Sequence, residues 1–195
     1  MQEHADFLGS YDVIIIGAGI VGSMVARFLS RYEGDDLEPL DILLIEKESD
    51  VCMGASSANT AIIHAGYNPL PGTLKAEMNV KANPMWDQLA EELQFPFERC
   101  GDYVVAVGEE ELPKLDLLMA RGEANGVVGM ALISGEEMRR REPHINPQVS
   151  GALWAETSGL CDPWAATVAA AENAVMNGVT LKLDTAFEDF VMHED

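Results

Sequence analysis

Three glycines in the spacing G-A-G-I-V-G, Gly17, Gly19 and Gly22, follow an apolar run and precede a helix-like segment. In this arrangement the first glycine permits a tight turn, the second lets a pyrophosphate approach the backbone, and the third lets helix and strand pack closely. The N–H groups of the first helical turn, at Ile20 and Val21, attract phosphate charge together with the helix dipole. These residues predict a dinucleotide-binding turn, and a glycine turn that binds no nucleotide is the alternative interpretation.

A carboxylate stands at the end of the next apolar run, where DILLIEKE contains Glu46. There it can accept hydrogen bonds from both hydroxyls of an adenosine ribose, and it would repel the 2′-phosphate of NADP. The fingerprint alone does not choose between NAD and FAD. An NAD domain would continue with alternating strands and helices, whereas this chain runs into ASSANTAIIHAG, residues 55–66. This departure indicates a flavin.

The elements that position these residues begin with a βαβ unit. We expect a strand over Val13–Ile16, buried on both faces as in parallel sheets, then a helix from Ile20 to Tyr32 and a second buried strand ending at Glu46. Farther along, the expected elements are a helix over 74–93 that breaks at Pro84, a strand over 97–108, a helix ending at Gly126, a helix capped by Ser134, a strand over 151–156, a helix from Pro163 to Gly178, and one or two closing strands.

Composition narrows the class of protein. The 33 acidic and 12 basic residues give a formal net charge of -21, which disfavours nucleic acids and anionic lipid surfaces as partners. Cys52, Cys100 and Cys161 lie far apart and predict neither a metal site nor a disulfide framework, so they fit a reducing compartment. No apolar run approaches a membrane span, and residues 1–10 lack the pattern of a signal peptide. We therefore expect a cytoplasmic protein.

Several stretches, in the expected order, resemble the amino-terminal half of the D-amino-acid-oxidase-like FAD-dependent oxidoreductases: YDVIIIGAGIVG, LLIEKE, GASSANTAIIHAGY, PGTLKA, ISGEEMRRREPHI and GLCDPWAATVAAAENAVMNGV. Within that superfamily the chain is most similar to the branch of glycerol-3-phosphate dehydrogenases and L-2-hydroxyglutarate dehydrogenases. The resemblance implies FAD as cofactor, with an adenosine-side contact from Lys47 and flavin contacts from Ser56, Ser57, Asn59, Thr60 and Ala61. A helix N-cap pair is a second interpretation of the two serines, compatible with the first.

The resemblance also bears on His64, which lies in the part of the family pattern that approaches the flavin. Oxidation of an alcohol carbon requires loss of the hydroxyl proton, and an imidazole is suited to accept it. His64 could instead position the flavin, or pack in a core behind Ile62 and Ile63. Lys75 is a candidate contact for an anionic substrate, although a solvated lysine at a helix start fits the sequence equally well.

The resemblance implies an α/β fold with a Rossmann-like FAD-binding domain over 11–83. An α+β substrate-domain segment over 84–160 is inserted into it, and the FAD-binding domain resumes over 161–195. Family members are much longer than this chain. We therefore expect a truncated flavoenzyme, or one that a further chain completes, and we expect this chain alone to bind FAD weakly and to be inactive.

The expected activity is oxidation of sn-glycerol 3-phosphate to dihydroxyacetone phosphate, with hydride transfer to FAD and onward to an electron acceptor that the sequence does not identify. Oxidation of L-2-hydroxyglutarate or another 2-hydroxy acid is the nearest alternative, followed by amine oxidation. From a different class, the chain could be a nucleotide-binding module without catalysis.

Overall fold

The computed structural model describes residues 9–32 and 39–192, which form two compact units. The first unit contains the described residues up to Asn59 and from Pro163 onward, and the second unit contains Thr60–Asp162. The first division therefore lies after Asn59, whereas the sequence suggested one after residue 83. Residues 60–83 group with the second unit because their strand and their hydrogen bonds join partners there.

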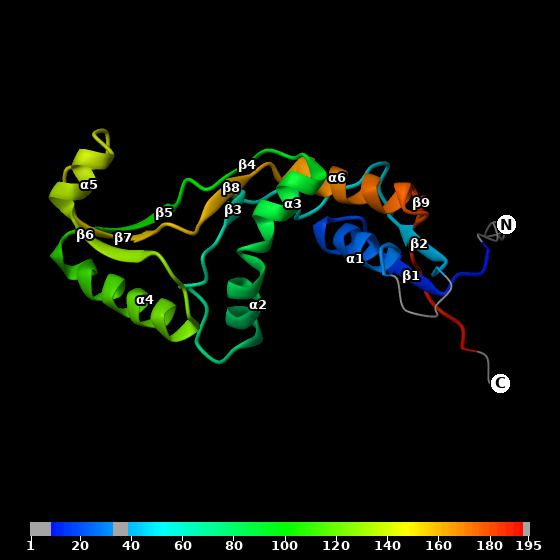
Figure 1. Cartoon of the computed structure of the whole chain (residues 1–195), viewed down its shortest axis with the longest axis horizontal. Helices are drawn as coiled ribbons and strands as arrows, with labels where there is room; N and C mark the ends of the chain where they lie inside the picture. The colour runs from blue at the N-terminus through cyan, green and yellow to red at the C-terminus, as the bar shows by residue number, and fades with distance from the viewer. Residues whose placement is uncertain (1–8, 33–38, 193–195) are drawn as a thin grey trace. The chain divides into compact units, whose positions relative to one another are not determined.

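The first unit is built on a parallel sheet with the strand order β1-β2-β9. Its strands are β1 (Val13–Ile16), β2 (Ile42–Ile45) and β9 (Thr180–Lys182), and the predicted βαβ start is confirmed by helix α1 (Ile20–Ser30) between the first two. Helix α6 (Pro163–Met176) packs beside α1 (Figure 1). The carboxyl ends of all three strands therefore lie at one edge of the sheet, where parallel sheets hold ligands.

Small side chains allow α1 and α6 to approach each other closely. Ala26 of α1 and Ala171 and Ala174 of α6 are fully or almost fully buried, and they share a core with Ile42 and Leu44 of β2. Alanine has strong helix propensity and loses no side-chain entropy on burial, so the alanine-rich segment forms both the helix and its contact surface.

Strand β1 differs from its prediction. Burial on both faces was expected, but Ile14 and Ile16 are 56% and 57% exposed, while Val13 and Ile15 pack against the core. The prediction is wrong for this strand because β1 is an edge strand among the described residues, with β2 as its sheet neighbour. It is correct for β2, whose four residues are all buried.

The second unit contains an antiparallel sheet with the order β5-β7-β6. The strands are β5 (Asp102–Val107), β7 (Val149–Ala155) and β6 (Met130–Ser134). A short 3-10 helix, η1 (Glu109–Glu111), leads into helix α4 (Leu112–Asn125), and helix α5 (Gly135–Arg141) follows β6 directly. Leu115 of α4 packs with Leu153 and Ala155 of the central strand, so α4 covers one face of the sheet.

A second small sheet of this unit has the order β3-β8-β4 and is antiparallel. Its strands are β3 (Ile62–Ile63), β8 (Gly159–Cys161) and β4 (Phe97–Glu98), and helices α2 (Leu74–Ala82) and α3 (Met85–Leu93) lie between β3 and β4 in the chain. The helix break predicted at Pro84 is confirmed. Proline lacks an N–H group and cannot continue the hydrogen-bond ladder of a helix.

The single strand expected over 97–108 is instead two strands, β4 and β5, which belong to different sheets. The chain turns between them at Gly101, where φ is +69° and a Cβ atom would stand 1.9 Å from the ring of Trp154. The prediction failed because the alternation of apolar residues continues across this turn, and the ring that passes Gly101 comes from a distant strand.

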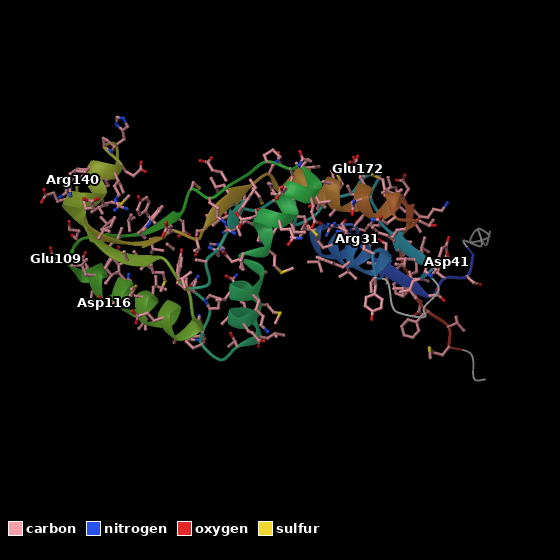
Figure 2. The ribbon with its side chains drawn as sticks, in the orientation of Figure 1. Arg31, Asp41, Glu109, Asp116, Arg140 and Glu172 are labelled. Carbon is pink, nitrogen blue, oxygen red and sulfur yellow. The ribbon has the colours of Figure 1, made fainter. Side chains whose placement is uncertain are left out.

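Most of the described carboxylates are exposed or partly exposed, so water screens their mutual repulsion. In Figure 2 the labelled side chains Glu109, Asp116 and Arg140 of the second unit, and Arg31 and Glu172 of the first, are all exposed. Across the described part of the chain, no helix is both long enough and apolar enough to pass through a membrane.

Candidate functional site

The glycine turn between β1 and α1 has the geometry that its sequence predicted. Gly17 has a φ of +98°, a conformation that favours glycine, and its N–H donates to Ile45 O over 2.8 Å. A Cβ atom on Gly22 would lie 1.9 Å from Gly17 O, closer than any real contact. The third glycine therefore allows the helix to begin directly against the turn.

Ser56, from a later part of the chain, provides a hydrogen-bond acceptor for the first N–H group of α1. The N-cap residue Gly19 has no side chain, and Ser56 Oγ accepts a hydrogen bond from Ile20 N over 2.9 Å. A Cβ atom on Gly19 would approach Ser56 Oγ to 2.9 Å, so glycine makes room for this contact. Ser56 is thus a capping residue, but it caps α1 rather than a helix of its own. Ser57 Oγ instead donates to Gly54 O within its turn.

The carboxylate of Glu46 is held beside the same turn. Oε2 accepts from Ala18 N over 2.8 Å, and Oε1 accepts from Glu48 N over 3.1 Å. Each carboxylate oxygen can accept more than one hydrogen bond, so both retain capacity for the hydroxyls of a ribose. The main chain of Glu46 is fixed as well, because its N–H donates to Lys182 O and its carbonyl accepts from Thr185 N.

These groups surround a cavity of about 510 Å³, here called the first cavity, at the carboxyl ends of β1 and β2. Five of the predicted cofactor residues line it: Gly17, Gly19, Glu46, Lys47 and Ser56. Residues 185–187 also line it and were not predicted, because their sequence carries no signal other than its position after the last strand. Ile20, Val21 and Gly22 belong to α1 at its edge.

The other predicted flavin contacts do not line this cavity. Asn59 Nδ2 donates to Ser56 O and Ala55 O, which fixes the turn that presents Ser56. Thr60 and Ala61 begin the second unit, and Ala61 has a φ of +62° and accepts from Cys161 N. Contact of these residues with a flavin stays a prediction.

The second unit contains a cavity of about 460 Å³, here called the second cavity, which brings His64 and Lys75 together. The other lining residues are Asn68, Pro69, Leu70, Thr73 and Asn79. Thr73 also caps α2, since its Oγ1 accepts from Ala76 N, and this places Lys75 in the first turn of that helix. The cavity thus offers one imidazole, one ammonium group and several neutral hydrogen-bonding groups to a ligand.

His64 follows β3 and has a half-exposed side chain whose Nδ1 lies 4.0 Å from Asp102 Oδ2. The same oxygen accepts a hydrogen bond from the hydroxyl of Tyr67 over 2.8 Å. Burial raises the pKa of Tyr67, and the neighbouring carboxylate raises it further, so the tyrosine remains a donor. The sequence did not single out Asp102 or Tyr67, because only the fold brings the first strand residue of β5 to the histidine.

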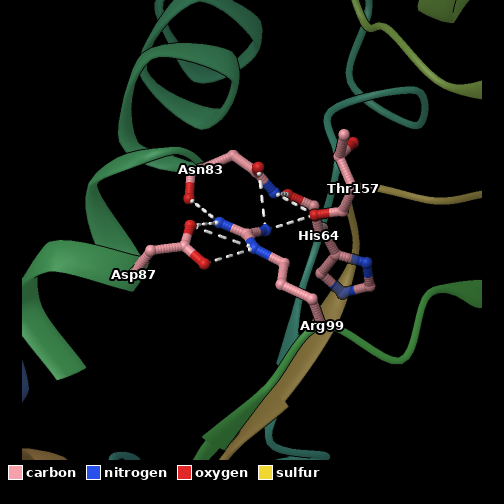
Figure 3. Close-up of polar contacts among 5 residues, drawn as sticks. All are labelled: His64, Asn83, Asp87, Arg99 and Thr157. Carbon is pink, nitrogen blue, oxygen red and sulfur yellow. Dashed lines mark hydrogen bonds and ion pairs between the residues drawn. The ribbon is translucent and has the colours of Figure 1, made fainter. Parts of the chain in front are cut away.

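The main chain of His64 is held by a separate polar network (Figure 3). Asn83 Nδ2 donates to His64 O over 3.0 Å and to Thr157 O over 2.9 Å. Arg99 in turn donates to both oxygens of Asn83 and to Thr157 O, and it forms an ion pair with Asp87. The guanidinium lowers the pKa of Asp87. Arg99 was also missed by the sequence, since a lone arginine before a strand carries no pattern.

Comparison with known proteins identifies the family of the chain. The model of the family described as FAD dependent oxidoreductase matches residues 12–195. A glycerol 3-phosphate dehydrogenase of Caloramator mitchellensis is 45% identical over 92% of this chain and 36% of its own length. A mitochondrial L-2-hydroxyglutarate dehydrogenase of Caenorhabditis briggsae is 35% identical over 80% of this chain and 34% of its own length.

Solved structures show the same fold. The dithionite-reduced L-alpha-glycerophosphate oxidase from Mycoplasma pneumoniae, with FAD bound, matches with a TM-score of 0.82 at 31% identity, over 91% of this chain and 45% of that one. Glycine oxidase from Bacillus cereus matches with a TM-score of 0.81 at 25% identity, over 94% and 49%. The chain thus spans less than half the length of these relatives. The predicted family resemblance and α/β fold are confirmed.

Proposed function

The chain belongs to the family of FAD dependent oxidoreductases, and from this membership we propose that it forms the nucleotide-binding part and a first substrate-binding part of a flavoprotein dehydrogenase. The proposed reaction is oxidation of an alcohol carbon in a small anionic molecule. The leading substrate is sn-glycerol 3-phosphate, with dihydroxyacetone phosphate as product. The observation that carries the proposal is the second cavity, where His64 and Lys75 meet in one space.

The first cavity fits the ADP part of FAD. Gly17 and Gly19, which have no side chains, line it directly before the start of α1, and this arrangement suits a pyrophosphate. Glu46 is suited to the ribose because its carboxylate is already oriented by two backbone N–H groups. Contacts from residues 57 and 59–61 to the flavin stay a prediction. Bound FAD would supply the acceptor for the hydride that leaves the alcohol carbon.

The chain's own contribution to the chemistry is to bind the anion and accept the proton. Lys75 is the group proposed to hold the phosphate, because it is the cation among the residues that line the second cavity. A local cation is needed there, since the net charge of -21 repels an anionic substrate at long range. His64 is proposed to accept the hydroxyl proton, which allows the carbonyl to form as the hydride departs.

L-2-hydroxyglutarate is the second candidate substrate, and the 35% identity to a dehydrogenase of that name favours it. Its carboxylates could use the same lysine. Amine oxidation ranks third, on the similarity to glycine oxidase. The electron acceptor is not assigned. We also propose the cytoplasm as the compartment, because the three cysteines are free thiols, as in reducing surroundings.

The test is anaerobic bleaching of the flavin in the complete flavoprotein that carries this chain. We expect glycerol 3-phosphate to bleach the flavin and hydroxyglutarate, glycine and sarcosine to do so far more slowly. Bleaching by hydroxyglutarate alone would reject the leading substrate. Absence of bleaching by every candidate would favour a nucleotide-binding module without catalysis.

Two lysines of α2 make a matched pair for the anion contact. Lys75 lines the second cavity, whereas Lys81 lies on the same helix and pairs with Glu77 at the surface. Lys75→Met should raise the substrate concentration for half-maximal bleaching about tenfold or more, because a charge-assisted contact contributes about 1.5 kcal/mol or more. Lys81→Met should leave it unchanged. Equal effects of both substitutions would reject the assignment of Lys75.

A further inference from the structure

The carboxylate of Asp102 is mostly buried, yet only one of its oxygens has a hydrogen-bond partner among the described residues. It lies at the first residue of β5, opposite Ala155 of β7, and its side chain is only 15% exposed. Oδ2 accepts the hydrogen bond from Tyr67, but Oδ1 is buried and finds no hydrogen-bond partner among the described residues. Burying a carboxylate oxygen without a hydrogen-bond partner costs free energy, so a further role for the Asp102 side chain has to be looked for.

The neighbouring imidazole is the group that this carboxylate can serve. His64 Nδ1 is the ring nitrogen that faces Asp102, at 4.0 Å from Oδ2. That separation exceeds a hydrogen bond, and the His64 side chain is half exposed. Hydrogen bonds at catalytic groups are commonly long before substrate binds. With Nδ1 turned to Asp102, the other nitrogen, Nε2, is left for the second cavity.

We propose that Asp102, held by Tyr67, is the positioning residue for His64, and that it fixes the imidazole with the proton on Nδ1 and the lone pair of Nε2 free. This inference rests on the proposed function, in which His64 accepts the substrate proton. In that reaction the hydroxyl O–H bond would break, its proton would bond to Nε2, and the electron pair left on oxygen would form the carbonyl. FAD, when bound, would supply the acceptor for the hydride that leaves carbon. Asp102 then stabilises the imidazolium without touching the substrate.

Tyr67 has a defined part in this arrangement. Burial and the nearby Asp102 both raise the pKa of Tyr67, so the tyrosine hydroxyl keeps its proton and donates a hydrogen bond to Asp102 Oδ2. Its ring packs in the core with Leu115 and Leu153, which fixes the hydroxyl in place. Tyr67 thus anchors one oxygen of Asp102 and keeps the carboxylate beside the histidine.

The first test reads the tautomer of His64 by NMR with isotope-labelled histidine, under mildly alkaline conditions where histidine is ordinarily neutral. The His64 signals are identified by their loss in His64→Gln. We expect the Nδ1–H form in the native protein. Asp102→Asn should shift His64 toward the Nε2–H form, because the amide presents a donor to Nδ1. Asp116→Asn, at an exposed position on α4, is the control and should leave the tautomer unchanged.

The second test measures anaerobic flavin reduction by glycerol 3-phosphate in the complete flavoprotein. Asp102→Asn should slow the limiting rate about 10- to 100-fold, the range known for removal of groups that orient metal-bound histidines. The half-saturating substrate concentration should change less than about twofold, because Asp102 does not reach the substrate. A folded Asp102→Asn protein with the native His64 tautomer, or with the native rate, overturns the proposal.

Tyr67→Phe keeps the proposal falsifiable if Asp102→Asn fails to fold. It should reduce the Nδ1–H population of His64 and the limiting rate in the same direction by a smaller factor, while Tyr103→Phe, on the same strand as Asp102, should change neither. Equal results for the two tyrosines overturn the proposal. Failure of the proposed function looks different: His64→Gln would then reduce flavin at the native rate, even though Asp102→Asn still altered the tautomer.

Discussion

Replacing Arg99 by alanine is expected to destabilise the second unit more than any other single loss of a polar side chain in the network of Figure 3. The guanidinium donates to Asn83 Oδ1 over 3.0 Å, to Asn83 O over 2.5 Å and to Thr157 O, and it pairs with Asp87 Oδ2 at 2.6 Å. It therefore joins Asn83, which follows α2, to the turn that follows β7. Through Asn83 it also supports the hydrogen bond to His64 O.

The expected loss in free energy of unfolding depends on whether each partner of Arg99 can form another hydrogen bond once the guanidinium is removed. Asp87 is 58% exposed and can be rehydrated, so its ion pair contributes less than about 1 kcal/mol. The bonds to the two carbonyls are partly buried and charge-assisted, each contributing about 1.5–3 kcal/mol. Thr157 O keeps its bond from Asn83 Nδ2, which lowers the loss on that side. We expect Arg99→Ala to cost about 2–4 kcal/mol.

The assay is urea unfolding of Arg99→Ala and of Asp87→Asn, which removes only the exposed ion pair and should cost less than about 1 kcal/mol. Because Arg99 lowers the pKa of Asp87, this pair stabilises the fold above the ordinary carboxyl value of 3.8 and stops doing so as the pH falls through the lowered value. Arg99→Ala should lack this part of the acid dependence. A loss in Arg99→Ala no larger than that in Asp87→Asn would refute the reasoning.

Three further substitutions test the first cavity. Gly22→Ala should lower the free energy of unfolding in urea by about 3 kcal/mol or more, because the new Cβ would lie 1.9 Å from Gly17 O and the backbone there cannot shift easily. A decrease of less than about 1 kcal/mol would contradict the close packing of helix and turn. Ser56→Ala removes the acceptor for Ile20 N and should cost about 1 kcal/mol, again by urea unfolding, with no change as the contrary result. Glu46→Gln should weaken FAD binding about tenfold in a flavin-fluorescence titration of the complete flavoprotein, because a charged acceptor becomes neutral; undiminished affinity would exclude the ribose role.

Several parts of the fold that the sequence predicted correctly are encoded within one turn of chain. The glycine turn follows from steric demands at Gly17 and Gly22, which neighbouring residues fully specify. Ser134 caps α5 by accepting from Glu137 N, and Gly126 ends α4 in a left-handed conformation, both as expected. The break at Pro84 belongs to the same class. In each case the cause and the effect lie within a few residues of each other.

The features that the sequence did not predict depend on contacts between distant segments. Ser56 caps a helix that begins 36 residues earlier in the chain, and the sequence around Ser56 does not indicate that role. Asp102 and Tyr67 are 35 residues apart in the chain, and only the fold of the second unit brings them together. The exposure of Ile14 was not predicted for a similar reason. The apolar sequence of a strand does not show whether that strand lies at the edge or at the centre of its sheet.

The stretch Met53–Tyr67 shows how local and distant effects combine. Up to Asn59 the chain is folded back on itself by side-chain bonds to its own carbonyls, which leaves the hydroxyl of Ser56 to cap α1. Ala61 then adopts a left-handed conformation, which is strained for a residue other than glycine, and the chain continues as β3 toward His64. Beyond Ala61 the local pattern stops being informative, because the two groups placed beside His64, Asp102 and Asn83, both come from later in the chain.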